Sequence, residues 1–181
     1  MATHFPLLLL LGLSCAALAT EEIPICYNYS CAAIEMVEFD AAQMNEIRLL
    51  LAMSADAEAE RGAIARVVGQ FETYTGMQTP TWADKGGNLA DDGEEGRMDC
   101  HDESGNTTTY LSLLERNGWL RFHRVLDPVY RIQQLVYQHW AAHIVEIDSI
   151  REFVVDSWFF DNGHPAVVFP LDEWLNGAWP E

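Results

Sequence analysis

The periodicity of apolar residues changes at Gly118, and this change limits the folds that are open to the chain. Before Gly118, apolar residues recur at the spacing of helices that bury one face. After Gly118, apolar and polar residues alternate or run together in short stretches, as they do in strands. Helices followed by neighbouring strands are typical of an α+β domain. We therefore expect N-terminal helices and a central helix packed on an antiparallel β-sheet.

Caps and turn residues predict where the elements begin and end. Asp40 is a suitable N-cap for a helix to about Met53, and Ser54 is expected to start a second helix that Gly76 ends. The strand candidates are residues 119–125, 135–147 and 151–157. The other segments are predicted as an irregular or short-strand lead-in at 23–38, a loop at 79–97, turns at 127–128 and 148–149, and a final helical turn at 171–175.

The helix expected at residues 99–118 carries a cysteine in its first turn. Its apolar stripe consists of Thr107, Tyr110, Leu111 and Leu114. Extended back by one heptad, the same face reaches Cys100. Asp99 is a suitable N-cap with Asp102 three residues further on, and Gly118 is suited to end the helix.

The position of Cys100 has opposing effects on its thiol. A helix N-terminus favours the thiolate, but the helix dipole contributes only about 0.3–1 kcal/mol. Asp99, Asp102 and Glu103 are close in sequence, and negative neighbours raise a cysteine pKa. A reactive Cys100 would therefore need a histidine partner. On residue statistics alone, a single cysteine is as often a small buried apolar residue as a functional thiol.

The overall charge restricts the partners of the chain. The 181 residues suit one domain, and 28 acidic residues against 10 basic ones give a net charge of −18. Such a chain is not expected to bind nucleic acid or an anionic membrane surface. A peptide or protein substrate would be neutral or basic; the sequence does not indicate an oligomeric state.

Residues 1–19 resemble an export signal. Leu7 to Leu11 form a short apolar core, and Ala17-Leu18-Ala19 offers a small-residue cleavage site before Thr20. The apolar run is too short to span a membrane. We therefore expect an exported protein, periplasmic or secreted, whose single domain covers residues 20–181.

The cysteine count leaves one thiol without a partner. Cys15 would leave with the signal, and Cys26 and Cys31 are close enough for a local disulfide in an oxidising compartment. Cys100 would then be a free thiol in an exported protein. Such a residue is a candidate functional group.

Two of the expected strands carry a histidine and a carboxylate for this thiol. His139 and Asp156 are separated by 17 residues around the turn at 148–149, so we expect them roughly opposite one another across a hairpin. Asp156 follows apolar residues, where a carboxylate is costly unless it is paired. With Cys100 this predicts a nucleophile, a base and an orienting carboxylate.

These residues resemble the site of a known superfamily. The carriers of the resemblance are Asp99-Cys100, His139-Trp140 and Asp156, within residues 98–158. The pattern is similar to that of the transglutaminase-like (papain-like) cysteine peptidases, which include exported bacterial enzymes. The resemblance implies that Cys100 is the nucleophile, His139 the general base and Asp156 the orienter, with no cofactor. It also implies hydrolysis or acyl transfer at amide bonds through a thioester.

The histidine motif departs from the family pattern. The family often has an aromatic residue two positions after the histidine, whereas here Trp140 follows His139 directly. His143 lies four residues further on the same strand face and competes for the role of the base, for which we prefer His139.

Two other functions stay open from the sequence. An exported binding or structural module could keep the fold without catalysis. A zinc site is the second alternative, although no CxxC or HExxH spacing supports it. Its ligands would come from Cys100, His101, Asp102, His139 and His143. The histidines expected to be structural or at the surface are His101, His123 and His164.

Overall fold

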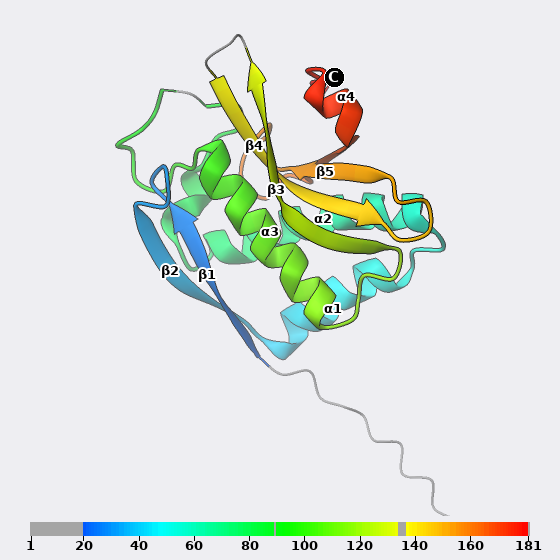
Figure 1. Ribbon diagram of the computed structural model, residues 1–181. Helices are drawn as coiled ribbons and strands as arrows, with labels where there is room; N and C mark the ends of the chain where they lie inside the picture. Colours follow the sequence, from blue (N-terminus) through cyan, green and yellow to red (C-terminus); the bar gives the residue numbers. More distant parts are fainter. Residues whose placement is uncertain (1–19, 89, 134–136, 181) are drawn as a thin grey trace, which may run out of the picture.

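The computed structural model describes residues 20–88, 90–133 and 137–180, so the predicted export signal at 1–19 lies outside the described residues. Within the described residues the chain forms four α-helices, one 3-10 helix and two antiparallel sheets (Figure 1). This agrees with the expected α+β class. None of the described helices is long and apolar enough to cross a membrane.

The chain starts with a hairpin and continues through helices into the larger sheet. Strands β1 (Glu21–Tyr27) and β2 (Ala33–Phe39) pair with each other. The helical part comprises α1 (Ala41–Ala52), α2 (Ala57–Gly76), the 3-10 helix η1 (Pro80–Ala83) and α3 (Cys100–Arg116). The second sheet has the order β3 (His123–Gln133), β4 (Tyr137–Glu146), β5 (Glu152–Asp156) and β6 (Val167–Pro170), and α4 (Leu171–Leu175) follows.

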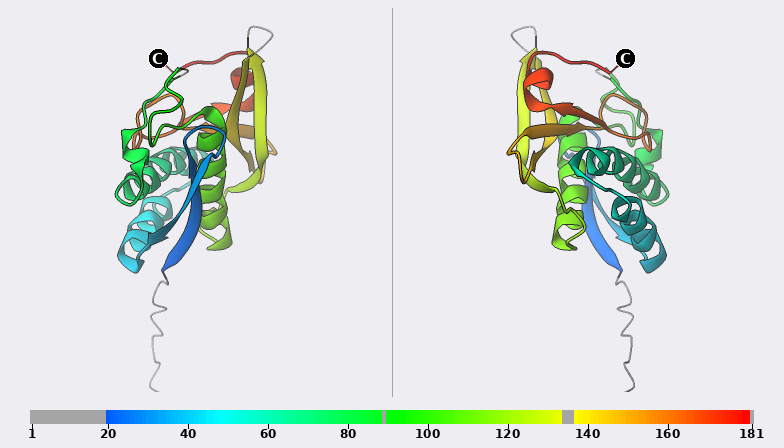
Figure 2. Two further views of the ribbon diagram at one scale, coloured as in Figure 1. Left: turned by 90° about the vertical axis from the view of Figure 1, so that its left-hand side faces the viewer. Right: turned by 90° about the vertical axis from the view of Figure 1, so that its right-hand side faces the viewer.

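Helix α3 lies at the centre of the molecule (Figure 2). It contacts β1 and α2 on one side and β3, β4 and β5 on the other. The predicted stripe is buried, with Thr107, Leu111 and Leu114 completely inaccessible. Tyr110 stacks on Phe71 of α2 with ring centroids 4.9 Å apart. Buried apolar area is the main stabilising contribution to such a core, so the apolar stripe explains why this helix is central.

Several caps agree with the sequence. The Asp40 carboxylate accepts hydrogen bonds from the backbone N–H groups of Ala42 and Gln43 and forms a capping box. Asp99 caps α3, and Gly118, at φ 69°, follows its C-cap. Glycine is the residue that adopts this left-handed conformation at least cost.

Other boundaries differ from the predictions. Helix α2 begins at Ala57 because Asp56, rather than Ser54, accepts a hydrogen bond from the N–H group of Ala59. Residues 23–38 are a regular hairpin, and β6 was not predicted. The predicted turn at residues 127–128 lies inside β3, where the pairing register shifts between Leu126 and Val129. A β-bulge accommodates Pro128, which has no N–H group to donate to the sheet.

Candidate active site

The first turn of α3 places Cys100 beside β4. Its Sγ atom lies 3.7 Å from the carbonyl oxygen of Gln138, and the backbone N–H of Trp140 also hydrogen-bonds to it. These two backbone groups flank His139 in the sequence. Pairing of β4 with β5 ends at Ala142 and Val155. Cys100 therefore contacts a part of β4 whose backbone is not paired with β5. The structure therefore brings Cys100 to the strand segment that carries His139.

The surroundings of Cys100 favour the neutral thiol. Burial is the largest effect and, together with the charges of Asp99 and Asp156, raises the thiol pKa to about 11. Hydrogen bonds from the backbone N–H groups of Trp140 and Cys100 itself act in the opposite direction. The thiol is therefore protonated at neutral pH. This agrees with the expectation that the helix N-terminus alone does not activate it.

His139 and Asp156 form a buried pair. The distance from His139 Nε2 to Asp156 Oδ2 is 2.7 Å, and the side chains are 5% and 1% exposed. The expected contact is present, but the two residues are not directly opposite. Extending the register beyond Ala142 and Val155 by one residue places Asp156 opposite Ala141. The pair is therefore diagonal, which neighbouring strands allow for long side chains on one face.

Aromatic side chains enclose the imidazole of His139. Its ring centroid lies 4.8 Å from that of Trp158, 5.6 Å from that of Phe159 and 5.6 Å from that of Trp174. Trp174 also donates a hydrogen bond of 2.8 Å from Nε1 to Asp156 Oδ2. Trp174 was not among the predicted site residues, since it lies in the last helix, far from Asp156 in its own pattern. An aromatic residue there has no spacing signal that relates it to Asp156.

The other histidines have different partners. His143 Nε2 lies 3.2 Å from Glu152 Oε2, so the competitor of His139 pairs with another carboxylate. His123 is completely buried and lies 2.9 Å from Glu60 Oε1. His101 and His164 are exposed, and His101 stands edge-on to Trp140. These positions agree with structural or surface roles for His101, His123 and His164.

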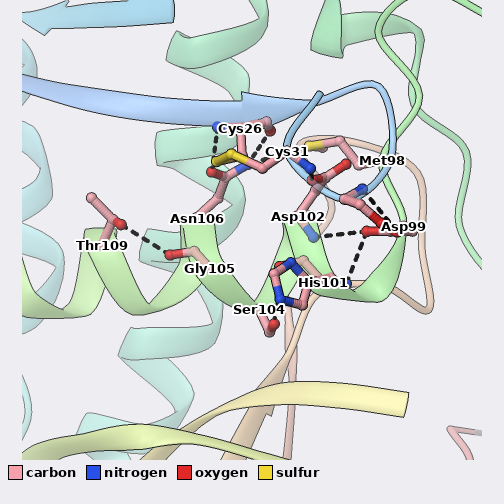
Figure 3. The surroundings of a disulfide bond; sticks show 11 residues. Cys26, Cys31, Met98, Asp99, His101, Asp102, Ser104, Gly105, Asn106 and Thr109 are labelled. Atoms are coloured by element: carbon pink, nitrogen blue, oxygen red, sulfur yellow. Dashed lines mark hydrogen bonds between the residues drawn. A yellow bond between two sulfur atoms is a disulfide. The ribbon is translucent and has the colours of Figure 1, made fainter. Parts of the chain in front are cut away.

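The predicted disulfide joins Cys26 and Cys31 and closes the turn of the first hairpin (Figure 3). Residues 28–31 all have positive φ angles, between 53° and 67°. Successive residues in left-handed conformations direct backbone N–H groups to one side, where they can bind an anion. Here the N–H of Ser30 donates to Asp99 Oδ2 at 3.0 Å, and the N–H of Cys31 donates to Asp102 Oδ1. The disulfide turn therefore holds the two carboxylates that flank Cys100.

Asp102 is largely protected from water by this turn. Burial is the main cause that raises its pKa to about 6, and the charge of Asp99 adds to this effect. Hydrogen bonds from the backbone of Cys31, Asp99 and Tyr29 lower the pKa. The N–H groups of the turn thus compensate part of the cost of burying a carboxylate beside the thiol.

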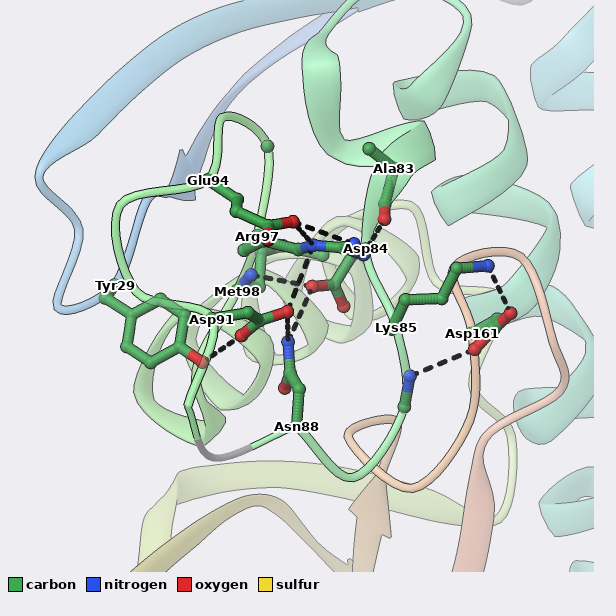
Figure 4. Close-up of polar contacts among 12 residues, drawn as sticks. Tyr29, Ala83, Asp84, Lys85, Asn88, Asp91, Glu94, Arg97, Met98 and Asp161 are labelled. Carbon is green, nitrogen blue, oxygen red and sulfur yellow. Dashed lines mark hydrogen bonds and ion pairs between the residues drawn. The ribbon is translucent and has the colours of Figure 1, made fainter.

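Ion pairs and hydrogen bonds hold the acidic loop before Cys100 together (Figure 4). Arg97 pairs with Asp91 at 3.0 Å and with Glu94 at 3.1 Å. Asp84 Oδ1 accepts a hydrogen bond of 2.7 Å from the N–H of Met98. The loop is therefore tied to the residue that precedes Asp99, the N-cap of α3.

Three carboxylic acids lie buried behind the site. Burial raises the pKa of Glu72 to about 8 and that of Asp84 to about 6, and it raises the pKa of Glu103 well above its usual value. Glu103 accepts a hydrogen bond from the hydroxyl of Ser157, the residue after Asp156. From its place in the sequence, Glu103 was expected to be a charge beside Cys100. At neutral pH this buried group is instead held largely in its protonated form.

The described residues contain no group of three or more His, Cys, Asp or Glu side chains that could hold a metal ion. The suggested zinc ligands have other partners: Asp102 binds the N–H of Cys31, and His143 binds Glu152.

Comparisons with known proteins give no match for this chain, either to a family model, to a curated protein or to a solved structure. The resemblance to the transglutaminase-like peptidases therefore rests on the residues named above.

Proposed function

We propose that the protein is an exported thiol hydrolase or acyltransferase that acts on amide bonds through Cys100, His139 and Asp156. The observation that carries the proposal is the buried His139–Asp156 pair. The β4 backbone on both sides of His139 contacts the sulfur of Cys100. Nucleophile, base and orienting carboxylate are the components of such a triad. A transglutaminase-like arrangement of residues 20–181 is part of the proposal.

The hydrogen bond to Asp156 assigns different roles to the two nitrogens of His139. A carboxylate accepts hydrogen bonds, so Nε2 carries the hydrogen, and Nδ1 is the nitrogen with a free electron pair. Because the Cys100 thiol has a pKa of about 11, it must lose its proton to a base during the attack. Nδ1 of His139 is that base in our proposal.

The reaction then proceeds in two acyl transfers. The Cys100 sulfur adds to the amide carbonyl while His139 takes the thiol proton, and His139 next gives this proton to the leaving amine as the C–N bond breaks. The product is a thioester on Cys100. Water attacks it with His139 as base and releases an acid, or an amine attacks it and forms a new amide. Asp156 keeps the imidazole in place and stabilises its positive charge.

The net charge of the protein supports a peptide or protein substrate that is neutral or basic. With a net charge of −18, the chain attracts cations and repels anions at long range. The Cys26–Cys31 disulfide supports an exported location, periplasmic or secreted, since disulfides persist in oxidising compartments.

Alkylation of Cys100 by iodoacetamide near neutral pH tests the proposed base. We expect His139→Ala to slow the reaction at least about tenfold, because the thiol then has no proton acceptor. The matched control is His143→Ala, which removes a buried histidine of the same strand that binds Glu152. Equal rates in the wild type and His139→Ala would contradict the proposal.

A second experiment tests acyl transfer itself. The wild type is incubated with a mixture of neutral and basic peptides, and intact-protein mass spectrometry records acyl adducts. We expect an adduct on Cys100 that hydroxylamine removes and that is absent in Cys100→Ala. Fast alkylation of Cys100 without any acyl adduct or peptide cleavage would favour a binding module.

A further inference from the structure

The carboxylate of Asp156 receives two hydrogen bonds on a single oxygen. His139 Nε2 lies 2.7 Å from Oδ2, and Trp174 Nε1 donates to the same atom at 2.8 Å. Asp156 is 1% exposed and Trp174 is completely buried, so water does not compete with either donor at this oxygen. A carboxylate held by two donors from different elements has little freedom to rotate. The direction of Oδ2, and with it the orientation of the imidazole, depends on both donors.

Arg131 fixes the helix that supplies the second donor. Its Nη1 donates to the carbonyl oxygen of Trp174, and to that of Ala178 at 3.1 Å. The guanidinium also lies over the Trp174 ring, 4.6 Å from its centroid. Arg131 is the cross-strand partner of His139 in the β3–β4 pairing. The contacts therefore form a closed ring through His139, Asp156, Trp174 and Arg131.

This closed ring of contacts joins four elements that lie apart in the sequence. Strands β4 and β5 supply the imidazole and the carboxylate, α4 supplies the indole, and β3 supplies the guanidinium. The Asp156 charge opposes the effect of burial on Arg131, whose pKa burial lowers. The carboxylate of Asp156 thus has hydrogen bonds to an imidazole and an indole N–H, and it interacts electrostatically with a guanidinium. This arrangement keeps the carboxylate of Asp156 directed at His139.

We propose that Trp174 is a positioning residue of the triad, which acts on His139 through Asp156 and is held in place by Arg131. The inference rests on the proposed function of Cys100, His139 and Asp156. The indole has two effects in it. Its N–H group orients the carboxylate, and its ring, together with Trp158 and Phe159, excludes water from the imidazole.

Trp174→Phe separates these two effects, because it keeps an aromatic ring and removes the N–H donor. We expect Cys100 alkylation to slow about fivefold, the change in rate that corresponds to the net free energy of one hydrogen bond. Proton NMR should show the imidazole Nε2–H signal of His139 shifted or broadened. The matched control is Trp179→Phe. Trp179 packs on Trp158 and Phe159 of the same aromatic cluster and is 57% exposed. This variant should keep the wild-type rate and signal.

A measurement on the wild type makes the test independent of any variant. In the wild type, the indole N–H of Trp174 should exchange with D2O much more slowly than that of the exposed Trp179, because it donates to Asp156 Oδ2. Equal alkylation rates in the wild type and His139→Ala would overturn the proposed function. If His139→Ala reacts more slowly, but Trp174→Phe reacts at the wild-type rate or the Trp174 indole N–H exchanges as fast as that of Trp179, only the positioning role is wrong.

Discussion

At the scale of single residues, the reactivity of Cys100 depends on opposing charges and dipoles within one helix turn. Asp99 both caps α3 and raises the thiol pKa, so one side chain stabilises the helix and suppresses the nucleophile. The backbone N–H groups of Trp140 and Cys100 act in favour of the thiolate, and the proposed base His139 would accept the thiol proton. Replacing the charge while keeping the cap separates these roles of Asp99.

Asp99→Ser should make Cys100 more reactive. Serine is as good an N-cap as aspartate but carries no charge, so the thiol pKa falls while α3 keeps its start. Because a less basic thiolate is also a weaker nucleophile, we expect only about a threefold rise in alkylation rate near neutral pH. Asp92→Asn, which removes a charge from the exposed acidic loop, is the control and should leave the rate unchanged. A slower reaction of Asp99→Ser would contradict the electrostatic role of this carboxylate.

The pH dependence of His139→Ala should reveal the thiol itself. Without the base, alkylation requires the free thiolate, whose pKa is about 11. The rate is therefore expected to rise continuously from neutral pH towards that value. Rates measured over this range check the prediction, and a plateau below about pH 9 would mean that burial does not raise the pKa.

At the scale of elements, the turn between β1 and β2 stabilises the start of α3. Four consecutive residues, 28–31, hold left-handed conformations that non-glycine residues adopt at a cost. The disulfide and the hydrogen bonds from the turn to Asp99 and Asp102 offset this cost. Asn106 adds two further bonds to the backbone of Cys26, so α3 and the hairpin form one unit.

Removal of the disulfide should therefore affect both elements. For the double variant Cys26→Ser/Cys31→Ser we expect the free energy of unfolding in urea to fall by about 2 kcal/mol, the loop-closure value for so short a loop. Amide hydrogen exchange should become faster at Cys31 and in the first turn of α3. Cys100→Ser, which keeps the disulfide, is the control and should remain close to the wild type. Unchanged exchange at α3 in the double variant would show that the turn does not support the helix.

At the scale of the whole molecule, acidic groups of two kinds determine how stability depends on pH. The pKa values of Glu72, Asp84 and Glu103 are raised in the folded state, mainly by burial. Those of Glu60, Asp91, Glu146 and Asp161 are lowered, although burial acts against this at all four groups. The folded state binds more protons than the unfolded state at the first group and fewer at the second.

The protein should be most stable in mild acid. Stability from the raised groups is lost as the pH rises from the unfolded pKa of about 4.5 through the folded value of about 8 for Glu72. Stability from the lowered groups is lost as the pH falls below about 4.5. We therefore expect Tm to be highest near about pH 5 and to fall by several degrees towards about pH 8. Repulsion within a chain of net charge −18 acts in the same direction.

Two variants of α2 isolate the contribution of the buried Glu72 to the pH dependence of Tm. Glu72→Gln should reduce the loss of Tm between mild acid and about pH 8, because the amide has no proton to lose. Glu58→Gln makes the same change of charge at an exposed position of α2 and should leave the slope of Tm against pH close to that of the wild type. Equal slopes in Glu72→Gln and the wild type would mean that Glu72 does not bind the extra proton.

The sequence alone determined the features that depend on neighbours along the chain. The caps at Asp40 and Asp99, the apolar stripe of α3, its end at Gly118 and the Cys26–Cys31 bond were predicted because each depends on residues a few positions apart. The approach of His139 to Asp156 was also predicted, since a single turn connects their strands.

Only the tertiary structure decided which groups meet across elements. The β4–β5 register makes the His139–Asp156 contact diagonal, and the early end of β5 exposes β4 to Cys100. The bond from Trp174 to Asp156 requires the last helix to pack behind this sheet. Such contacts depend on strand register and helix packing, which the free energy of the whole core determines. No local pattern around Trp174 contains that information.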